Sequence, residues 1–271
     1  SKFENTQFYS LLKKNNIDVV GFDEKSLLQK TLKIYIFLKK VKADVVHANL
    51  GSLLHILLAV AMSGVKTRVF TFHSVANRAA GNSRIKKFVY SFALKKMKFI
   101  PVGISDCVKK SISEEYSIPL ESIPCIYNGV DTKIFLPGVM EKASGNKIRF
   151  VSVGTLYHIK NHKLLIKAFA KTEKLYPDIT LSIIGDGELR EELDSLIKEY
   201  GLVNKIRLLG TIHNVDFYLR QSDIYVMSSN VEGLSLAVLE AMACGLPIIS
   251  TNAGGVVNIV ENGKNGLITP I

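Results

Sequence analysis

The apolar positions of this chain form short continuous runs that alternate with longer stretches of helical spacing. The short runs predict buried strands, at 43–47, 68–73, 99–102, 123–127, 147–153, 180–184, 206–209, 224–227 and 248–250. The longer stretches predict helices, at 7–15, 25–42, 53–62, 85–96, 163–175 and 189–199. This alternation indicates an α/β fold, with parallel sheets and crossover helices on both faces.

A polar, turn-rich stretch over 137–146 divides the alternation into two parts. We therefore predict two Rossmann-like domains, 1–138 and 147–271, joined by a linker at 139–146 and facing a cleft. Ligands of open parallel sheets bind beyond the carboxyl ends of the strands. The loops of both domains are therefore expected to face that cleft.

The net charge of +11 lies in the first of these domains. Residues 1–138 hold 21 Lys/Arg against 10 Asp/Glu, whereas residues 139–271 hold 14 of each. Such asymmetry indicates an anionic partner for the first domain, either nucleic acid or a membrane surface. No recognised nucleic-acid-binding motif accompanies the charge, so we expect no nucleic acid partner.

The predicted helix at 85–96 carries part of this charge. One narrow face, at about 100° per residue, holds Arg84, Lys87, Ser91, Lys95 and Lys98. The apolar side chains lie away from that face; they are Ile85, Phe88, Val89 and Phe92. A basic amphipathic helix is typical of a surface that rests on anionic lipid, although a solvated basic face is an equally ordinary interpretation.

Compartment and metal content follow from weaker signals. The three cysteines (Cys107, Cys125 and Cys244) are far apart, which disfavours a disulfide framework and a metal site. The first ten residues lack the apolar core of a signal peptide. The most apolar stretch, 53–62, is shorter than the roughly 20 residues that span a bilayer, and we interpret it as a buried helix. We expect a cytoplasmic protein, without a metal, that can lie on the inner membrane face.

The stretch from Glu232 to Pro247 is the strongest chemical signal. Gly233 and Ser235 suit the entry of a helix, and Gly245 suits its end. The free amides at that entry, around Gly233 to Leu236, can bind an anion such as a pyrophosphate. Glu232 at the lip and Glu240 about two turns further could then hold hydroxyl groups. Two solvated glutamates on an amphipathic helix are the alternative.

Three further positions follow predicted strands and would face the cleft. Lys160, after Gly154, could neutralise a phosphate, although a surface lysine is the commoner case. Gly187 belongs to a glycine turn that lacks the dinucleotide-binding fingerprint. His73 could hydrogen-bond a sugar, whereas a lone histidine is more often structural, as we expect for His47 and His55.

Together these residues resemble the GT-B glycosyltransferases, in particular family 4 (glycosyltransferase group 1). The segment with glutamates eight positions apart, continuing as EAMACGLPIISTNAGG, is highly characteristic. The resemblance covers essentially the whole chain. Further matching stretches are Asp44-Val-Val-His-Ala, Thr71-Phe-His, Asn128-Gly-Val-Asp, Gly154 with Lys160-Asn-His, and Asn262-Gly-Lys-Asn-Gly-Leu.

The resemblance implies a role for each matching position. Glu232 and His73 would act at the donor sugar, Lys160 would bind the donor phosphates and Glu240 the ribose. The remaining donor-binding positions would be Gly154, Thr155, Gly233, Leu234, Ser235, Gly187 and, near the base, Ile212. The family retains anomeric configuration, needs no metal or other cofactor, and takes nucleotide-sugar donors, here expected to be UDP- or GDP-linked.

Two departures from the family pattern stand out. Many relatives carry an arginine where this chain has Thr155, so one phosphate-binding cation is missing. The first strand of the N-terminal domain, its glycine-rich loop and the closing C-terminal helices are not found. We therefore expect a fragment, truncated at both ends, of a longer transferase.

The leading hypothesis is a transferase that extends a saccharide or lipid-linked acceptor in surface polysaccharide or glycolipid synthesis. One alternative is another reaction on the same fold, such as an epimerase, phosphorylase or synthase. A non-catalytic nucleotide-binding remnant is the other.

Overall fold

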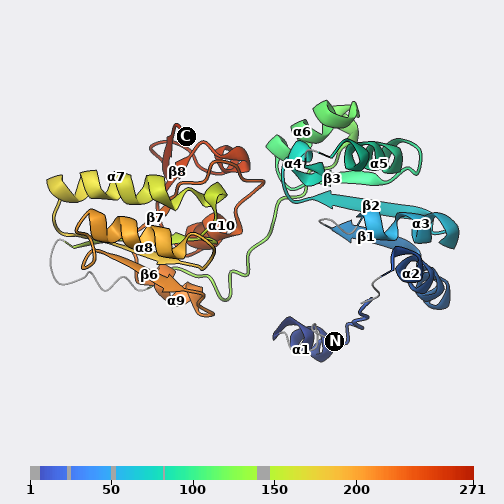
Figure 1. Ribbon diagram of the computed structural model, residues 1–271, viewed down its shortest axis with the longest axis horizontal. Helices are drawn as coiled ribbons and strands as arrows, with labels where there is room; N and C mark the ends of the chain where they lie inside the picture. The colour runs from blue at the N-terminus through green and yellow to red at the C-terminus, as the bar shows by residue number, and fades with distance from the viewer. Residues whose placement is uncertain (1–6, 23–25, 50–52, 82, 139–146) are drawn as a thin grey trace.

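The computed structural model describes residues 7–22, 26–49, 53–81, 83–138 and 147–271 (Figure 1). The first half contains α1 (Gln7–Lys14), α2 (Leu27–Val41), β1 (Val45–Asn49), α3 (Leu53–Ser63), β2 (Thr67–Phe72), α4 (Ala76–Ala80), α5 (Arg84–Lys95), β3 (Ile100–Gly103), α6 (Asp106–Tyr116) and the short 3-10 helix η2 (Leu120–Ser122). The second half contains β4 (Ile148–Val153), η3 (His158–Lys160), α7 (His162–Leu175), β5 (Ile179–Ile184), α8 (Arg190–Glu199), β6 (Ile206–Gly210), α9 (Val215–Arg220), β7 (Ile224–Met227), α10 (Leu236–Ala243), β8 (Ile248–Thr251), η4 (Gly254–Asn258) and β9 (Gly266–Thr269).

A three-stranded parallel sheet, in the order β1-β2-β3, organises the first half. Its register pairs Ala48 with Phe70 and Thr71 with Val102. Phe70 and Phe72 are buried against Tyr90 of α5 in edge-to-face contacts, with ring centroids 5.5 and 6.4 Å from that of the tyrosine. Such aromatic packing contributes about 1 kcal/mol per pair beyond area burial and fixes α5 on the sheet.

A six-stranded parallel sheet, in the order β6-β5-β4-β7-β8-β9, organises the second half. Successive side chains of a strand point to opposite faces, so each face can carry a core. Leu181 and Ile183 of β5 pack with α7 and α8 on one face. Val151 of β4 packs with α9 and α10 on the other face. The doubly covered parallel sheet is the α/β architecture expected from the sequence.

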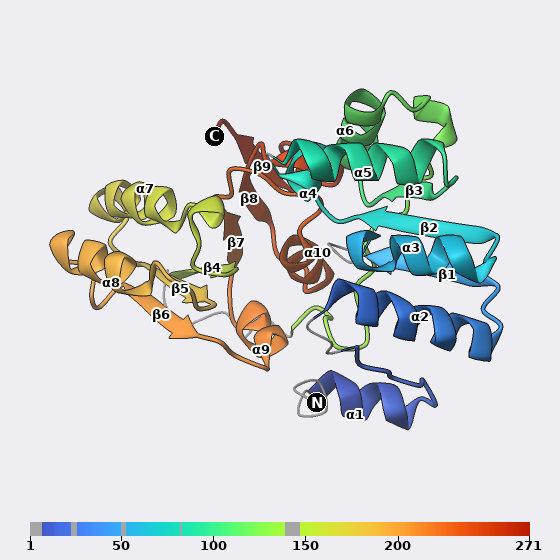
Figure 2. The ribbon, with the colours of Figure 1, turned by 45° about the vertical axis from the view of Figure 1, so that its right-hand side comes forward.

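The two halves meet through the segment that precedes α10 and through α6, which packs against η4 (Figure 2). Leu234 is 5% exposed and belongs to the hydrophobic core of the first half. The Ser105 hydroxyl donates to the Gly233 carbonyl at 2.8 Å, and Asn128 Nδ2 donates to the Leu234 carbonyl at 3.2 Å. These contacts bring the carboxyl ends of strands from both sheets to one region.

Most of the predicted elements are confirmed within one or two residues. The predicted strand at 123–127 is wrong, because this segment makes only an isolated bridge from Cys125 to Gly103. Pro124 has no N–H to donate to a ladder. Helices α4, α6 and α9 and strand β9 were not predicted.

Helix α3 differs from the wholly buried helix expected at 53–62. Leu53, Leu57 and Val60 are buried, but Leu58 and Met62 are exposed. Among the helices of the described residues, none is both long enough and apolar enough to cross a membrane. The predicted linker at 139–146 lies outside the described residues.

Candidate functional site

An ion pair between Lys160 and Glu232 lies at the carboxyl ends of β4 and β7. Lys160 Nζ is 2.6 Å from Glu232 Oε1, and the two side chains are 22% and 13% exposed. The Ser229 hydroxyl donates to the same carboxylate oxygen at 2.7 Å. The Lys160 carbonyl accepts from the hydroxyl of Ser228 at 2.9 Å. These bonds hold a cation and a carboxylate in a fixed, largely desolvated position where each interaction is stronger than in water.

Local backbone geometry explains why the segment around Glu232 is glycine-rich. A Cβ on Gly233 would lie 2.4 Å from the His73 carbonyl oxygen of the other half. Gly254 has φ +61°, and a Cβ there would lie 1.9 Å from the Glu232 carbonyl oxygen. Both positions therefore need a residue without a side chain, because the backbones approach too closely for any other.

A hollow of about 340 Å³ opens over the ion pair and is lined by residues of both halves. Its lining residues are His73, Ser74, Arg78, Ile159, Lys160, Val231, Glu232 and Gly233. Two cations and one carboxylate thus face a space that could accept a phosphate group and part of a sugar. The sequence prediction placed His73, Lys160, Glu232 and Gly233 at one site, and the structure brings these four together.

His73 also borders a second hollow, of about 300 Å³, over the carboxyl ends of the first sheet. His73 Nε2 is hydrogen-bonded to Asn49 Oδ1 at 2.9 Å, and His47 Nε2 to the Thr71 hydroxyl at 2.7 Å. Partial burial and the charge of His47 lower the pKa of His73. At neutral pH the His73 imidazole is therefore mainly uncharged, and it can exchange hydrogen bonds with a bound hydroxyl.

Glu240 lies on the second turn of α10, which begins after Ser235. Partial burial raises the pKa of its carboxyl group. Within the described residues its carboxylate has no hydrogen bond or ion pair, whereas Glu232 has both. Ser235 makes no side-chain cap, so it leaves the first amides of α10 free to bind an anion.

Gly154 and Thr155 lie beneath Lys160, at the end of β4. A Cβ on Gly154 would meet the Lys160 side chain at 3.4 Å, so the alkyl stem of the lysine lies over the glycine. His162 follows, 2% exposed, and neither ring nitrogen makes a well-aligned hydrogen bond. Burial lowers the pKa of His162 to about 4, only partly offset by the nearby backbone of Gly154 and Thr155.

Seven of the predicted donor-binding residues lie outside the lining of the 340 Å³ hollow: Gly154, Thr155, Gly187, Ile212, Leu234, Ser235 and Glu240. Gly187 packs against Leu156, since a Cβ there would lie 2.7 Å from the Leu156 carbonyl oxygen. Ile212 packs, partly buried, against the core that α9 and α10 form. Leu234 likewise points into a core, that of the first half. For Gly187, Ile212 and Leu234, a role in donor binding stays a prediction.

Sequence reasoning missed three residues of this region. Arg78 lines the hollow from α4, in the stretch between the predicted strand at 68–73 and the predicted helix at 85–96. Ser229 supports Glu232, and nothing in its spacing distinguishes it from other serines. His47, interpreted as structural, lines the second hollow beside His73. Each of these histidines ends a predicted strand, at 43–47 and 68–73, and that repeat was the available signal.

The described residues contain no group of three or more His, Cys, Asp or Glu side chains that could hold a metal ion. Independence from metal stays a prediction. The three cysteines are free thiols, of which only Cys244 is buried.

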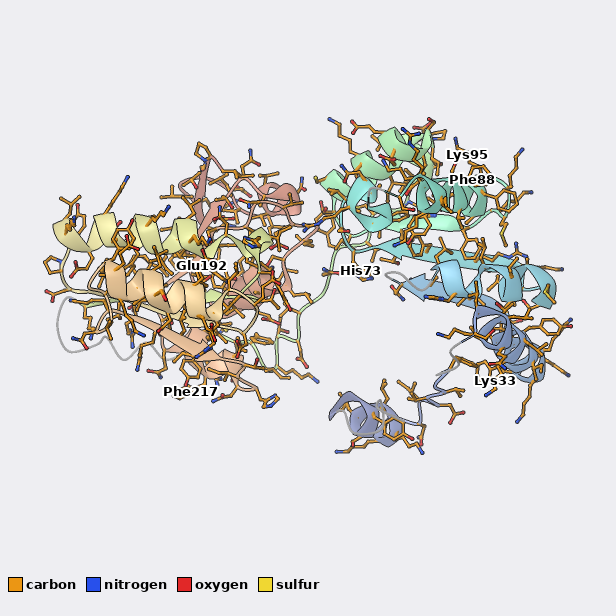
Figure 3. The ribbon with its side chains drawn as sticks, viewed as in Figure 1. Lys33, His73, Phe88, Lys95, Glu192 and Phe217 are labelled. Atoms are coloured by element: carbon orange, nitrogen blue, oxygen red, sulfur yellow. The ribbon has the colours of Figure 1, made fainter. Side chains whose placement is uncertain are left out.

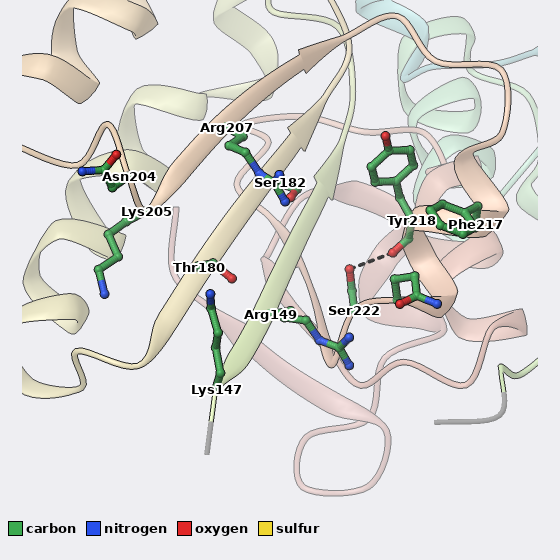
Figure 4. A pocket seen from close by; sticks show the side chains of 11 residues that line it. Lys147, Arg149, Thr180, Ser182, Asn204, Lys205, Arg207, Phe217, Tyr218 and Ser222 are labelled. Carbon is green, nitrogen blue, oxygen red and sulfur yellow. Dashed lines mark hydrogen bonds between the residues drawn. The ribbon is translucent and has the colours of Figure 1, made fainter. Parts of the chain in front are cut away.

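A larger hollow, of about 500 Å³, lies over the amino-terminal parts of β4, β5 and β6 (Figure 4). Its cations include Arg149, which forms an ion pair with Asp223 at 3.0 Å, and Lys205, whose Nζ is 3.7 Å from Glu173. Phe217 and Tyr218 of α9 form its other wall. Because ligands of parallel sheets bind at the opposite end of the strands, size alone does not make this hollow the candidate site.

Two family descriptions together cover most of the chain. Residues 140–271 match "Glycosyl transferases group 1", and residues 21–134 match "Glycosyltransferase Family 4". The UDP-Gal:alpha-D-GlcNAc-diphosphoundecaprenol alpha-1,3-galactosyltransferase of Escherichia coli is 32% identical over 269 residues, which are 93% of this chain and 68% of that protein.

A Campylobacter jejuni relative is similar at a comparable level. This N-acetylgalactosamine-N,N'-diacetylbacillosaminyl-diphospho-undecaprenol 4-alpha-N-acetylgalactosaminyltransferase is 30% identical over 223 residues, 80% of this chain and 60% of that protein. Among solved structures, Anabaena HepE in complex with UDP and glucose superposes with a TM-score of 0.82 at 22% identity, over 97% of this chain and 75% of that one. The chain thus spans roughly two thirds of the length of these curated relatives.

Proposed function

The chain belongs to the group 1, family 4 glycosyltransferases of the GT-B fold, and from this premise we propose that it transfers a hexose from a nucleotide-sugar donor to a lipid-linked saccharide. The observation that carries the proposal is the Lys160–Glu232 pair, facing a hollow that His73 closes from the other half. Because the relatives are longer than this chain, the activity is proposed for the protein that contains it.

The donor binds to the part of the site that the second half forms. Its diphosphate lies against Lys160 and the amides that open α10, where a cation and a helix N-terminus both favour negative charge. The ribose hydroxyls bind Glu240, whose carboxylate lacks a protein partner among the described residues. Its raised pKa reflects desolvation, and a hydroxyl donor would restore a hydrogen bond there.

Departure of the nucleoside diphosphate builds negative charge on the β-phosphate oxygens. Glu232 neutralises Lys160 at 2.6 Å, so the ammonium is already held where that charge develops. Such preorganised stabilisation is commonly worth 10²- to 10³-fold in rate for each group, as an order of magnitude. The sugar lies between Glu232 and His73, whose uncharged imidazole hydrogen-bonds a hydroxyl.

The acceptor enters from the first half, through the hollow that His47, Asn49 and His73 border. Support for a lipid-linked acceptor comes from the E. coli and C. jejuni relatives, whose names both include a diphospho-undecaprenol-linked saccharide. The reaction then takes place at the cytoplasmic membrane face, as a step of surface polysaccharide or glycolipid synthesis. We further propose that the anomeric configuration of the sugar is retained and that no metal takes part.

A transfer assay tests this function. Labelled UDP- or GDP-hexose is incubated with a diphospho-polyprenol-linked N-acetylhexosamine, and the lipid product is extracted. We expect the wild-type protein to form labelled lipid. Glu232→Gln should lower the rate at which labelled lipid forms by about 10²-fold or more. The coupling constant of the new anomeric proton reports retention or inversion. Donor epimerisation, or release of free sugar with no labelled lipid, would overturn the proposal.

A further inference from the structure

The 500 Å³ hollow over the amino-terminal parts of β4, β5 and β6 has a one-sided charge. Among the described residues that line it, four are cations and none is an Asp or Glu. The second half as a whole is neutral, since residues 139–271 hold 14 Lys/Arg and 14 Asp/Glu. A concave surface lined by one sign of charge raises the local concentration of ions of the opposite sign. The four cations are Lys147, Arg149, Lys205 and Arg207.

Two of these cations are unpaired within the described part of the chain. Arg149 and Lys205 are each paired with a carboxylate that lies outside the lining of the hollow. Lys147 and Arg207 are exposed, and neither side chain makes a hydrogen bond or an ion pair with any residue that the structure describes. An ammonium and a guanidinium with unpaired charge are the groups that proteins use to bind phosphate.

The floor of the hollow is a polar strip on the face of the sheet that α9 covers only in part (Figure 4). Leu181 of β5 belongs to the core under α7 and α8, so Thr180 and Ser182 on either side of it point to the opposite face. The register places Thr180 beside Arg149. On the other side of β5 it places Ser182 beside Arg207. Both faces of a parallel sheet are usually apolar and covered, so this strip is suited to a polar ligand.

The hollow also offers hydrogen-bonding groups and an aromatic ring. Its lining includes four Ser, Thr, Asn or Gln side chains that make no hydrogen bond with a described residue. Phe217 of α9 lines the hollow and is 49% exposed. The C–H groups of a sugar ring can pack on such an aromatic face, whose π electrons are negative, while the sugar hydroxyls bond polar side chains. The polar side chains are Thr180, Ser182, Asn204 and Gln221.

The hollow and the candidate donor site lie at opposite ends of the same strands. Lys147 precedes β4 (Ile148–Val153), whereas Lys160 follows it. The six residues of β4 span about 20 Å, at roughly 3.3 Å per residue. Figure 3 shows Phe217 on the second half, well apart from His73 at the candidate site. No described residue lines both this hollow and the 340 Å³ hollow, so a ligand in one leaves the other open.

We propose that the hollow lined by Lys147 and Arg207 binds a phosphorylated sugar, as a ligand separate from the donor. The phosphate contacts these two cations, the sugar hydroxyls bond the polar strip, and the sugar ring packs on Phe217. A volume of about 500 Å³ lies in the range of pockets that hold small ligands. The inference goes beyond the proposed function and does not rest on it, because none of these residues lines the candidate site.

The fluorescence of a single indole tests the proposal on the full chain. The sequence contains no tryptophan, so Phe217→Trp places one reporter in the wall of the hollow and keeps an aromatic ring there. Titration of this variant with glucose 1-phosphate should shift its emission, with half-saturation at about 1 mM or below. Inorganic phosphate lacks the ring and should need at least about fivefold more. Glucose lacks the phosphate and should bind at least about tenfold more weakly.

Two pairs of substitutions in the Phe217→Trp background test the cations. Arg207→Gln with Lys147→Gln should raise the half-saturating concentration at least about tenfold, because two charge-assisted contacts are lost. Lys171→Gln with Lys174→Gln is the matched control, since both lysines are exposed on α7 and lie outside the hollow. The control removes the same amount of charge and should leave the titration unchanged. All four side chains are exposed, so both variants should keep the circular dichroism of the wild type.

Lys160→Met separates this site from the donor site. In the Phe217→Trp background it should leave the titration with glucose 1-phosphate unchanged, whereas it should weaken the binding of nucleoside diphosphate. Loss of the glucose 1-phosphate titration in this variant would place the ligand in the donor site and overturn the inference. Binding of glucose 1-phosphate without any nucleotide binding would keep the inference and remove the transferase proposal. Nucleotide binding alone would do the reverse.

Three further results would overturn the proposal. Equal half-saturation by inorganic phosphate and by glucose 1-phosphate would mean an adventitious ion only. Equal weakening by the two pairs of substitutions would mean a general effect of net charge. If neither the emission of the indole nor calorimetry of the wild-type chain detected glucose 1-phosphate, the hollow would hold no such ligand.

Discussion

Lys160 is the residue from which the chemistry of the site is most directly argued. Its ammonium is fixed by Glu232 at 2.6 Å and lies in the hollow that both halves line. Thr155 beside it carries no charge, and Arg78 of α4 is the other cation in the lining of this hollow. Stabilisation of the negative charge on the departing diphosphate should depend strongly on Lys160.

We predict that Lys160→Met lowers kcat/KM for donor transfer by about 10²- to 10³-fold, because charge stabilisation in the transition state is lost. Steady-state kinetics with the lipid-linked acceptor measure this. Lys163→Met is the matched control, since Lys163 lies one turn away and pairs with Glu192 on α8. A Lys160 variant within about threefold of wild type would remove the lysine from the mechanism.

His162 gives a prediction about pH. Its pKa is about 4 in the folded chain and about 6.5 when unfolded, so between these values the unfolded state binds more protons. Stability must then fall as pH decreases from 7 towards 4. The expected loss between pH 7 and pH 5 is about 2 kcal/mol from this group.

Urea unfolding at the two pH values measures this loss. His162→Gln should reduce the difference between pH 7 and pH 5, whereas His213→Gln, at an exposed position, should not change it. If wild type and the His162 variant lost the same free energy of unfolding between pH 7 and pH 5, the imidazole would not be buried in its uncharged form.

At the site, the sequence predicted the residues whose position after a strand or before a helix carries meaning, such as Lys160 and Glu232. It did not predict residues that reach the site through tertiary structure. Arg78 comes from a short helix between the predicted strand at 68–73 and the predicted helix at 85–96, and Ser229 acts through the carboxylate of Glu232. Neither has a local pattern that spacing could detect.

At the scale of elements, one side-chain pair joins two neighbouring strands of the second sheet. Asp223, just before β7, accepts from the Arg149 backbone N–H at 2.8 Å and from its guanidinium at 3.0 Å. The hydrogen bonds from Arg149 lower the pKa of the Asp223 carboxyl. A carboxyl group whose pKa is lowered by folding stabilises the fold at pH values above its ordinary pKa. This stabilisation is lost as the pH falls through the lowered pKa of the folded state.

We predict that Asp223→Asn lowers the free energy of unfolding by about 2 kcal/mol at pH 7, because a charge-assisted bidentate bond is lost in a partly buried place. Urea unfolding measures the change. Asp216→Asn is the control, since its pair with Arg220 lies within α9, where such pairs contribute about 0.5 kcal/mol. If both substitutions lowered the free energy of unfolding equally, the pair between the two strands would contribute no more than the pair within α9.

Elements with strong periodicity were predictable, and those that depend on contacts were not. The strands of the second half are runs of β-branched and leucine residues, and their bounds agree closely with the prediction. Helix α6 has a polar sequence, and its start depends on Ser105, whose hydroxyl accepts from the Val108 amide. On α5, Phe88 and Phe92 are exposed, although the sequence pattern placed them on the apolar side of the helix. Spacing alone does not say which side of a helix packs on the sheet, and here it is the side of Tyr90.

At the scale of the whole molecule, the two halves differ in charge and in the surfaces that they offer. The first half carries the entire net charge of +11. The second half is neutral overall and provides Lys160, Glu232 and Glu240. This division suits an enzyme whose first half meets the acceptor and the membrane, and whose second half holds the donor.

We propose that Lys160, Glu232 and Glu240 belong to one nucleotide-sugar site. Calorimetric titration with UDP, GDP and ADP tests it most directly, with Glu240→Ala as the variant and Glu199→Ala, exposed on α8, as the control. We predict that one nucleotide binds to wild type and to the control, and that Glu240→Ala weakens its binding by about tenfold or more. Binding that Glu240→Ala leaves unchanged, or no binding of any nucleotide to the wild-type chain, would contradict it.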